Sequence, residues 1–225
     1  MEAMQKIKCL TIEDSNFPDR LRKLSGMPKK LYYIGNLPDP KKPAAAVVGA
    51  RMCSPYGRCQ AFKYARTMAS YGVQIISGMA RGIDAEGHKG ALDTDTPTFA
   101  VLGSGVDVCY PNSNRWLYQR ILEKGGGIIS ELPPGSPPVN WAFPARNRII
   151  SGLAEVVVIA EAKKKSGSLI TAEHALEQGK DIYVFPGRTT DALSYGCNAL
   201  IQQGAGIILS VEEFLKQLPY NATQS

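Results

Sequence analysis

Four short turns that combine glycine or serine with nearby basic or polar residues have the composition of an anion-binding site. Each turn follows an apolar run typical of a buried strand, and glycine lets the backbone approach a ligand closely. Where a helix follows, its first backbone N–H groups lack partners and favour an anion. We therefore expect one anion-binding rim, with these phosphate-binding residues: Gly49, Arg51, Gly78, Arg81, Gly103, Ser104, Lys163, Ser166, Gly167, Ser168 and Thr171.

A basic and aromatic cluster lies between the third and fourth turns and contains Phe143, Pro144, Arg146, Asn147 and Arg148. Phe143 and the nearby Trp141 can stack on nucleic-acid bases, which contributes ~1–3 kcal/mol per base. The alternative is that both rings fill the core while Arg146 bridges carboxylates. The sequence leaves both interpretations open, and the first makes this cluster a second candidate surface for a nucleic acid.

The cations of the rim also have structural alternatives. Arg51 can pair with a nearby carboxylate instead of a ligand. Arg81 can bind phosphate, or it can hold its own loop by pairing with Asp84 or Glu86. The three lysines at 163–165 can form a solvated surface, although their place just before a helix start favours an anion site.

The overall composition favours one α/β domain with a polyanionic partner. With 225 residues, of which 44% are hydrophobic, the chain can bury a full core. Its net charge of +6 favours a polyanionic partner. No apolar run reaches the ~20 residues of a membrane span, and the N-terminus lacks the apolar stretch of a signal peptide. We expect a cytoplasmic protein with no membrane partner.

The cysteines and histidines do not suggest a metal or catalytic site. The five cysteines form no Cys-x-x-Cys pair and do not cluster with His88 or His174, so we expect no metal. We expect them to be reduced and buried as small apolar residues. The Gly103-x-Gly105 turn lacks the third glycine of a dinucleotide fingerprint. No nucleophile–base–orienter trio is visible, which favours a cofactor-free binding protein over an enzyme.

The chain divides into three parts: a small N-terminal segment at 1–42, a Rossmann-like domain at 43–218 and a flexible tail at 219–225. Uniformly apolar runs predict strands at 44–48, 73–76, 98–102, 127–130, 155–160, 181–185 and 206–209. Amphipathic stretches predict helices at 55–71, 82–92, 113–124, 145–153, 168–178, 197–203 and 211–218. Such strands need cover on both faces, so this alternation predicts a doubly wound, mostly parallel sheet with helices on both sides.

Several motifs occur in a fixed order along the chain. They are Val48-Gly49-Ala50-Arg51, Ser77-Gly78-x-Ala80-Arg81-Gly82-Ile83-Asp84, Leu102-Gly103-Ser104-Gly105, Tyr110-Pro111, Phe143-Pro144-Ala145-Arg146-Asn147-Arg148, Glu161-Ala162 followed by Ser166-Gly167-Ser168, and Pro186-Gly187. Together they closely resemble the DNA-processing protein A family (DprA, also called Smf) over residues 10–217.

The resemblance implies an extended Rossmann-like domain that binds single-stranded DNA. It also implies a homodimer that protects incoming single strands during natural transformation and helps load the recombinase RecA, with a role in DNA recombination. The DNA contacts that it implies are Arg51, Lys163 and the stretch from Phe143 to Asn147. The turn Ser166-Gly167-Ser168, with Thr171, matches the family's phosphate-holding turn.

The sequence departs from the family pattern in three places. Ala50 stands where a serine or threonine is usual, which removes one hydroxyl donor but keeps the cation that follows. Val139 is apolar where some members carry a lysine, which should weaken DNA contact. Many members end in a winged-helix-like domain and some begin with a helical domain. This sequence shows neither, so we expect a minimal or shortened member.

Two functions other than DNA binding are compatible with the same residues, and the sequence also suggests a dimer interface. Nucleotide phosphoribohydrolases of the lysine-decarboxylase-like type share this superfamily, but Leu169 and Ile170 replace two defining residues of their turn. A sensor of a nucleotide-derived ligand would use nearly the same pocket. For a homodimer, we expect the helix at 197–203 and the last strand and helix to form the interface, through Leu200, Ile201, Ile207 and Phe214.

Overall fold

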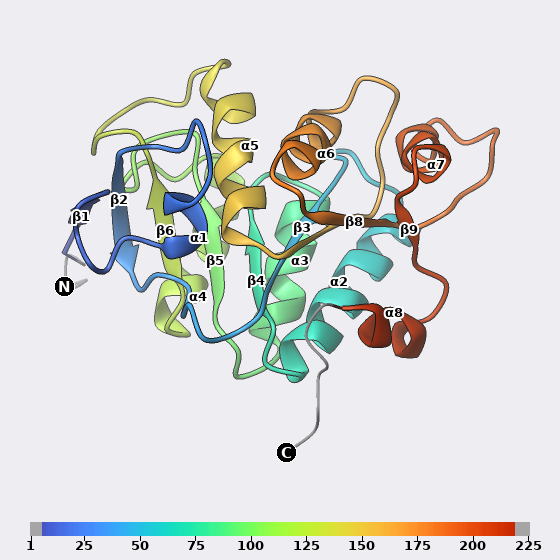
Figure 1. Cartoon of the computed structure of the whole chain (residues 1–225), viewed down its shortest axis with the longest axis horizontal. Helices are drawn as coiled ribbons and strands as arrows, with labels where there is room; N and C mark the ends of the chain where they lie inside the picture. The colour runs from blue at the N-terminus through green and yellow to red at the C-terminus, as the bar shows by residue number, and fades with distance from the viewer. Residues whose placement is uncertain (1–5, 219–225) are drawn as a thin grey trace.

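A single nine-stranded sheet runs through the whole molecule (Figure 1). The computed structural model describes residues 6–218, so the tail expected at 219–225 lies outside the described residues. The strand order is β1-β2-β6-β5-β4-β3-β7-β8-β9. The strands are β1 (Lys8–Thr11), β2 (Lys30–Gly35), β3 (Ala44–Val48), β4 (Gln74–Ser77), β5 (Thr98–Val101), β6 (Gly127–Ser130), β7 (Val156–Ile159), β8 (Asp181–Val184) and β9 (Gly206–Ile207).

The seven strands from β3 to β9 are parallel, as the uniformly apolar runs predict. The chain builds outward from β3 through β4, β5 and β6, and then returns to place β7 on the other side of β3. The strand order therefore reverses between β3 and β7. In open α/β sheets, a ligand crevice forms at the carboxyl ends of the strands at such a point.

Helices cover both faces of the sheet, which confirms the doubly wound fold. They are α1 (Asp19–Arg22), α2 (Pro55–Ser70), α3 (Ile83–Leu92), α4 (Arg115–Glu123), α5 (Ala142–Leu153), α6 (Gly167–Glu177), α7 (Tyr195–Gln202) and α8 (Val211–Gln217), with a 3-10 turn at η1 (Asn112–Asn114). Ala44, Ala46 and Val48 of β3 pack toward α1, α5, α6 and α7. Ala45 and Val47 face the opposite layer, with α2, α3 and α8, where α4 covers the neighbouring strands.

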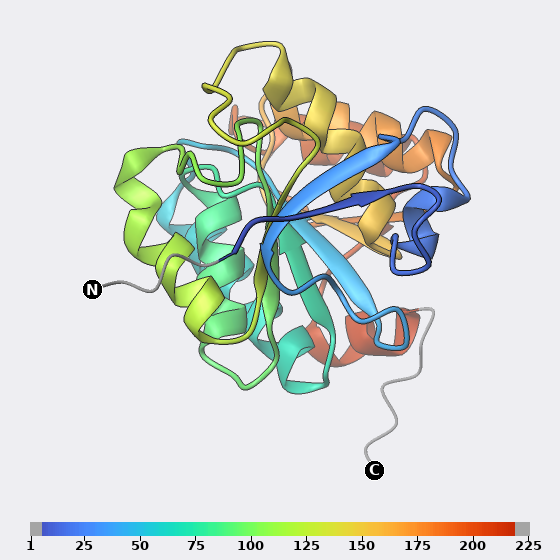
Figure 2. The same cartoon turned by 90° about the vertical axis from the view of Figure 1, so that its left-hand side faces the viewer.

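The N-terminal segment belongs to the same sheet. β2 pairs antiparallel with β6, and β1 pairs antiparallel with β2 at the sheet edge, which faces the viewer in Figure 2. Phe17 and Leu21 of this segment are fully buried in the core that α5 also covers. The described part of the small N-terminal segment expected at 1–42 thus extends the central sheet by two strands.

Two helix starts follow from serine caps that the sequence displays. Ser54 caps α2, and its side chain accepts a hydrogen bond from the backbone N–H of Gly57. Ser166 caps α6 by accepting from the N–H of Ser168. The fifth helix begins at Ala142, three residues before the expected start, because Pro144 is tolerated in a first turn.

The cysteines are all free, but most are not buried as expected. Cys197 is buried, Cys53 and Cys109 are half-buried, and Cys9 and Cys59 are exposed. Within residues 6–218, no group of three or more histidine, cysteine or acidic side chains is arranged to hold a metal ion. No helix in that range has the length and apolar character to cross a bilayer.

Candidate functional site

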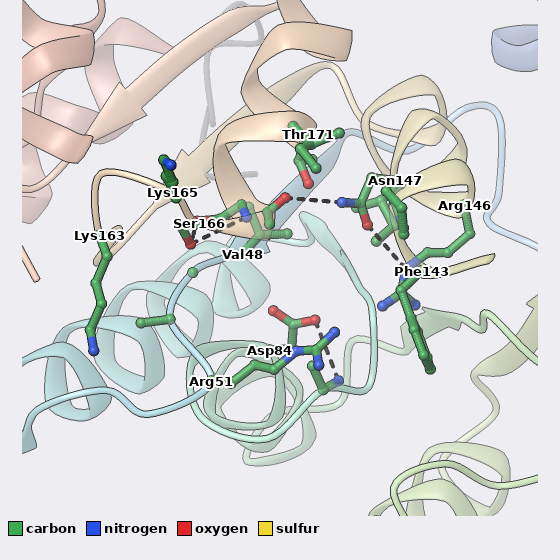
Figure 3. A pocket seen from close by; sticks show the side chains of 18 of the residues that line it. Val48, Arg51, Asp84, Phe143, Arg146, Asn147, Lys163, Lys165, Ser166 and Thr171 are labelled. Carbon is green, nitrogen blue, oxygen red and sulfur yellow. Dashed lines mark hydrogen bonds between the residues drawn. The ribbon is translucent and has the colours of Figure 1, made fainter. Parts of the chain in front are cut away.

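A cavity of about 310 Å³ opens at the carboxyl ends of β3 and β7, where the strand order reverses. Figure 3 shows Lys163 and Phe143 on opposite sides of this pocket, with Arg51 between them. The pocket brings together eleven of the residues expected from the sequence: Gly49, Arg51, Phe143, Pro144, Arg146, Asn147, Lys163, Ser166, Gly167, Ser168 and Thr171.

Three exposed cations line the pocket: Arg51, Lys163 and Lys165. None of them forms an ion pair in the part of the chain that the structure describes. The alternative pairing of Arg51 with a carboxylate is therefore not found there. Instead, the guanidinium carbon of Arg51 lies 5.3 Å from the centre of the Phe143 ring. The pocket thus offers positive charge beside an aromatic surface.

The N-terminus of α6 opens into this pocket. Ser166, Gly167, Ser168 and Thr171 all line it, and the hydroxyls of Ser166 and Ser168 lie 2.8 Å apart. Gly167 is exposed, and a Cβ there would meet no protein atom within 4 Å. The helix end carries a partial positive charge, although the N–H of Ser168 already donates to the Ser166 hydroxyl. An anion can therefore reach the backbone at this turn.

The N-terminus of α2, by contrast, is already occupied by a protein carboxylate. Glu161, two residues after the end of β7, is buried, and one of its oxygens accepts from the N–H of Ser54 at 2.9 Å. Its other oxygen accepts from the Ser54 hydroxyl, which in turn accepts from the N–H of Gly57 at 3.0 Å. The start of α2 therefore already has a protein carboxylate as its partner, while Gly49 and Arg51 of the preceding turn line the pocket.

Arg146 is buried beneath the pocket and clamps two of the strand-end turns together. Its guanidinium donates to the carbonyl of Gly78 at 2.7 Å and to the carbonyl of Val101. Its Nε donates to the side chain of Asn147, which donates to the carbonyl of Gly167 at 3.0 Å. We expected Arg146 to supply charge to a ligand, but its side chain is only 5% exposed and serves mainly to hold the turns.

Burial also perturbs the titration of this layer. Burial lowers the pKa of Arg146 to about 10, so its guanidinium stays charged at neutral pH. Burial raises the pKa of Asp84, while the positive charge of Arg146 opposes that rise. The Asp84 side chain makes no capping hydrogen bond at the start of α3, and one of its oxygens lies 3.4 Å from the N–H nitrogen of Ala80. Asp84 is buried, and it forms no ion pair among residues 6–218.

Four residues expected in the rim do not line the pocket: Gly78, Arg81, Gly103 and Ser104. Ser104 is buried and its hydroxyl donates to the carbonyl of Val108 at 2.7 Å. A Cβ at Gly103 would lie 2.8 Å from the Phe143 ring, so this glycine leaves room for that ring. Arg81 is exposed, and its Nε lies 3.4 Å from the Ser113 hydroxyl rather than pairing with Asp84 or Glu86.

The basic and aromatic cluster divides in the structure. Arg148 makes two hydrogen bonds to the carboxylate of Glu131, at 2.8 and 2.6 Å, away from the pocket. Trp141 is 63% exposed, so it does not fill the core, and it does not line the pocket either. Only Phe143 presents a ring to the pocket.

Sequence reasoning missed one aromatic ring and left open which of the three lysines at 163–165 reach the pocket. Tyr110, quoted only as part of a motif, places its ring centre 5.4 Å from that of Phe143. Lys165, the last of the three lysines, lines the pocket together with Lys163. Among the described residues that line the pocket, Asp84 is the single carboxylate and none is a histidine or a cysteine. The chemistry on offer is anion binding with ring stacking.

Comparison with known proteins identifies the family of the chain. The family model for DNA recombination-mediator protein A matches residues 8–219. The DNA processing protein DprA of Streptococcus pneumoniae is 42% identical over 96% of this chain and 76% of its own length. The protein Smf of Escherichia coli is 41% identical over 92% of this chain, which spans 56% of that protein.

Solved structures give the same result. The X-ray structure of DprA from Streptococcus pneumoniae superposes with a TM-score of 0.89, covering 96% of this chain and 76% of that one. DNA processing protein A of Helicobacter pylori, whose structure concerns its single-stranded DNA binding mode, has a TM-score of 0.84 at 31% identity. It covers 97% of this chain and 98% of its own. The chain therefore belongs to the family of DNA recombination-mediator protein A.

Proposed function

We propose that this chain binds single-stranded DNA in the pocket between the ends of β3 and β7. The observation that carries the proposal is the combination at one site of three cations that form no ion pair among residues 6–218, an accessible helix N-terminus and an aromatic ring. The related protein of Helicobacter pylori is described as binding single-stranded DNA, which supports the same ligand here.

Each part of the pocket has a role toward such a strand. A phosphate lies at the N-terminus of α6, where Gly167 leaves the backbone accessible. Arg51 and Lys163 neutralise neighbouring phosphates, and a base stacks on Phe143. Because backbone donors and stacking tolerate any base, we expect little sequence preference.

The wider activity is a proposal on the same basis. The chain acts as a binding protein rather than an enzyme, which fits a pocket lining without histidine or cysteine. It protects single strands in the cytoplasm and helps load RecA in natural transformation and recombination. RecA loading is tested by following RecA filament formation on strands that the protein has already bound.

A homodimer through the β9 edge is also part of the proposal. Leu209 is 73% exposed and Ile207 is 40% exposed beside this short edge strand. Leu200 and Phe214, expected at the interface, are instead buried in the core. Light scattering should show a dimer at tens of micromolar, and Leu209→Glu should shift it toward the monomer. A wild-type monomer at that concentration would contradict the dimer.

A binding titration tests the function. The protein is titrated with a single-stranded oligonucleotide, its duplex and a mononucleotide at two salt concentrations, and free base is assayed after incubation with the mononucleotide. We expect the single strand to bind most tightly and to weaken with salt. Equal affinity for the duplex would overturn the proposal. Tighter mononucleotide binding would indicate a sensor, and released base would indicate a phosphoribohydrolase.

A further inference from the structure

A row of cations and exposed rings extends beyond the pocket on both sides. It follows the carboxyl ends of five neighbouring parallel strands, which lie in the order β5, β4, β3, β7, β8. The segments after these strands supply, in the same order, Tyr110, Arg81, Arg51, the lysines at 163–165 and Tyr195. The pocket occupies only the middle of this row, at the ends of β3 and β7.

At one end of the row, the stacking surface of Phe143 continues onto Tyr110. The two ring centres are 5.4 Å apart and the rings are inclined by 34°, while Tyr110 remains 44% exposed. The Asn114 side chain donates to the carbonyl of Met79 at 2.8 Å and ties this loop to the turn after β4. That turn carries the exposed Arg81, whose Nε lies 3.4 Å from the Ser113 hydroxyl, so the segment that carries Tyr110 is tied to the turn that carries a cation.

At the other end, Tyr195 lies beside the lysines. The Lys164 ammonium is 5.4 Å from the centre of the Tyr195 ring, which is 48% exposed. The N–H of Gly196 donates to the carbonyl of Ala162 at 2.7 Å, and the N–H of Ala162 donates to the carbonyl of Leu193 at 2.8 Å. These bonds fix the start of α7 against the end of β7, so Tyr195 keeps its place beside the lysines.

The charge along the row is positive. Among residues 6–218, neither Arg81 nor Lys164 forms an ion pair. Two exposed carboxylates follow β5 and β8, and each is engaged by the backbone: Asp107 accepts from the N–H of Gly135 at 2.8 Å, and Asp191 accepts from the N–H of Leu193 at 3.0 Å. A polyanion can therefore pass along the whole row.

The row is long enough to accommodate several nucleotides. Neighbouring strands are ~4.8 Å apart, so the four gaps between five strands span roughly 19 Å. A stacked strand rises about 3.4 Å per nucleotide, so this distance accommodates roughly five nucleotides. On the basis of the proposed function, we propose that the single strand crosses the sheet edge at right angles to the β-strands, from Tyr110 to Tyr195. Each tyrosine stacks a base outside the pocket.

The test compares oligothymidylates of about three and about eight nucleotides, the short one filling the pocket and the long one spanning the row. Fluorescence anisotropy measures their affinity for the whole chain. Tyr110→Ala and Tyr195→Ala should each lower the affinity for the long oligonucleotide about 5- to 100-fold. They should change the affinity for the short oligonucleotide less than about twofold. Tyr110→Phe and Tyr195→Phe should retain affinity, because stacking requires the ring and not the hydroxyl.

Trp116→Ala is the matched control. Trp116 is 52% exposed on α4, outside the row, so its removal should change neither affinity. Arg51→Ala should weaken both oligonucleotides, because it acts in the pocket. Suppose that both tyrosine variants bind the long oligonucleotide as tightly as wild type while Arg51→Ala does not. The proposed path from Tyr110 to Tyr195 is then wrong, and the proposal that the pocket binds the strand is kept. If wild type binds neither oligonucleotide, the proposed function fails as well.

A second measurement tests the direction. A long oligonucleotide carrying one photoreactive thymine at either its 5′ or its 3′ end is cross-linked to the protein. We expect one end to label the peptide that contains Tyr110 and the other end to label the peptide that contains Tyr195. Labelling of the same peptide from both ends would contradict a strand that spans the row.

Discussion

The guanidinium of Arg51 lies over the ring of Phe143, with its central carbon 5.3 Å from the ring centre. Arg51 follows β3 and Phe143 belongs to α5, so the contact joins two segments that are distant in the sequence. A cation over a ring is attracted by ~0.5–1 kcal/mol at an exposed site. The contact places the charge and the stacking surface of the pocket side by side before a ligand arrives.

Removing the charge of Arg51 should therefore weaken binding and its salt dependence together. For a single strand, log K falls with log salt at a slope of about −0.7 for each phosphate neutralised. We expect Arg51→Ala, and equally Arg51→Met, to flatten that slope by roughly 0.7. Titrations with a labelled oligonucleotide at several salt concentrations measure it.

The control for net charge is Arg120→Ala on α4, far from the pocket. Arg120 pairs with Glu123 at 3.0 Å and lies on the surface, so its removal changes the net charge equally without removing a phosphate contact. Its slope should match that of wild type. If Arg51→Ala stays folded and keeps both the wild-type affinity and slope, Arg51 does not contact phosphate.

Glu161 should matter for stability because it satisfies the start of α2. Replacing it with alanine leaves the half-buried N–H and hydroxyl of Ser54 without their acceptor, which costs ~1–3 kcal/mol of unfolding free energy. Glu161→Gln keeps one acceptor oxygen, so its unfolding free energy should fall less than that of Glu161→Ala. Urea unfolding measures both. Glu177→Ala, whose side chain is 74% exposed, should stay within ~0.5 kcal/mol of wild type. A Glu161→Ala variant with the same unfolding free energy as wild type would contradict this role.

His88 predicts a pH dependence of stability. The single hydroxyl proton of Thr98 goes to the carbonyl of Ile75 at 2.7 Å, so the Nδ1 of His88 donates to Thr98 at 2.8 Å. Its Nε2 is buried without a partner in the described part of the chain. Burial, with the nearby charge of Arg146, lowers the pKa of His88 from 6.5 to about 3.

Between these two pKa values, the unfolded chain binds a proton that the native protein does not. The free energy of unfolding should therefore rise with pH between about 3 and 6.5, by up to ~1.4 kcal/mol per pH unit, and His88 contributes no slope above that window. Denaturant unfolding at about pH 5 and about pH 7.5 should show this, and His88→Gln should reduce the difference. If His88→Gln shows the same difference in unfolding free energy between the two pH values as wild type, other groups cause that difference.

The sequence was sufficient for the parallel part of the sheet but not for its N-terminal edge. Fully buried parallel strands such as β3 read as uninterrupted apolar runs, and this signal does not depend on distant residues. The strand β1, with the sequence Lys-Cys-Leu-Thr, carries no such signal and forms because β2 lies beside it. Propensity alone does not reveal an edge strand that its neighbour stabilises.

The site was predicted in its residue types but not in their division of labour. Glycines and cations at strand ends are visible in the sequence, which is why Arg51, Lys163 and Gly167 were found. Two facts depend on three-dimensional neighbours: Arg146 is turned inward by the carbonyls of Gly78 and Val101, and Glu161 closes the start of α2. Such contacts join residues far apart in the sequence, so local patterns do not report them.

Two glycine-to-alanine variants separate binding from stability. At Gly167 a Cβ meets no protein atom within 4 Å, and the residue is the first of α6. Alanine there should leave the unfolding free energy unchanged or raise it by up to ~1 kcal/mol, because alanine favours a helix over glycine. The same Cβ stands in the pocket where the phosphate would approach the backbone, so Gly167→Ala should weaken binding of a single-stranded oligonucleotide.

Gly90→Ala should behave in the opposite way. In α3 a Cβ at Gly90 would collide with the carbonyl oxygen of Phe62 and lie 2.9 Å from the backbone nitrogen of Arg66, so α3 and α2 would be forced apart. Overpacking of this kind costs ~1–3 kcal/mol of unfolding free energy, while each folded molecule keeps its pocket. Paired unfolding and binding titrations distinguish the two effects. If Gly167→Ala binds the oligonucleotide as tightly as wild type, the phosphate does not approach the backbone at α6, and Arg51 and Lys163 must hold the strand without the helix end.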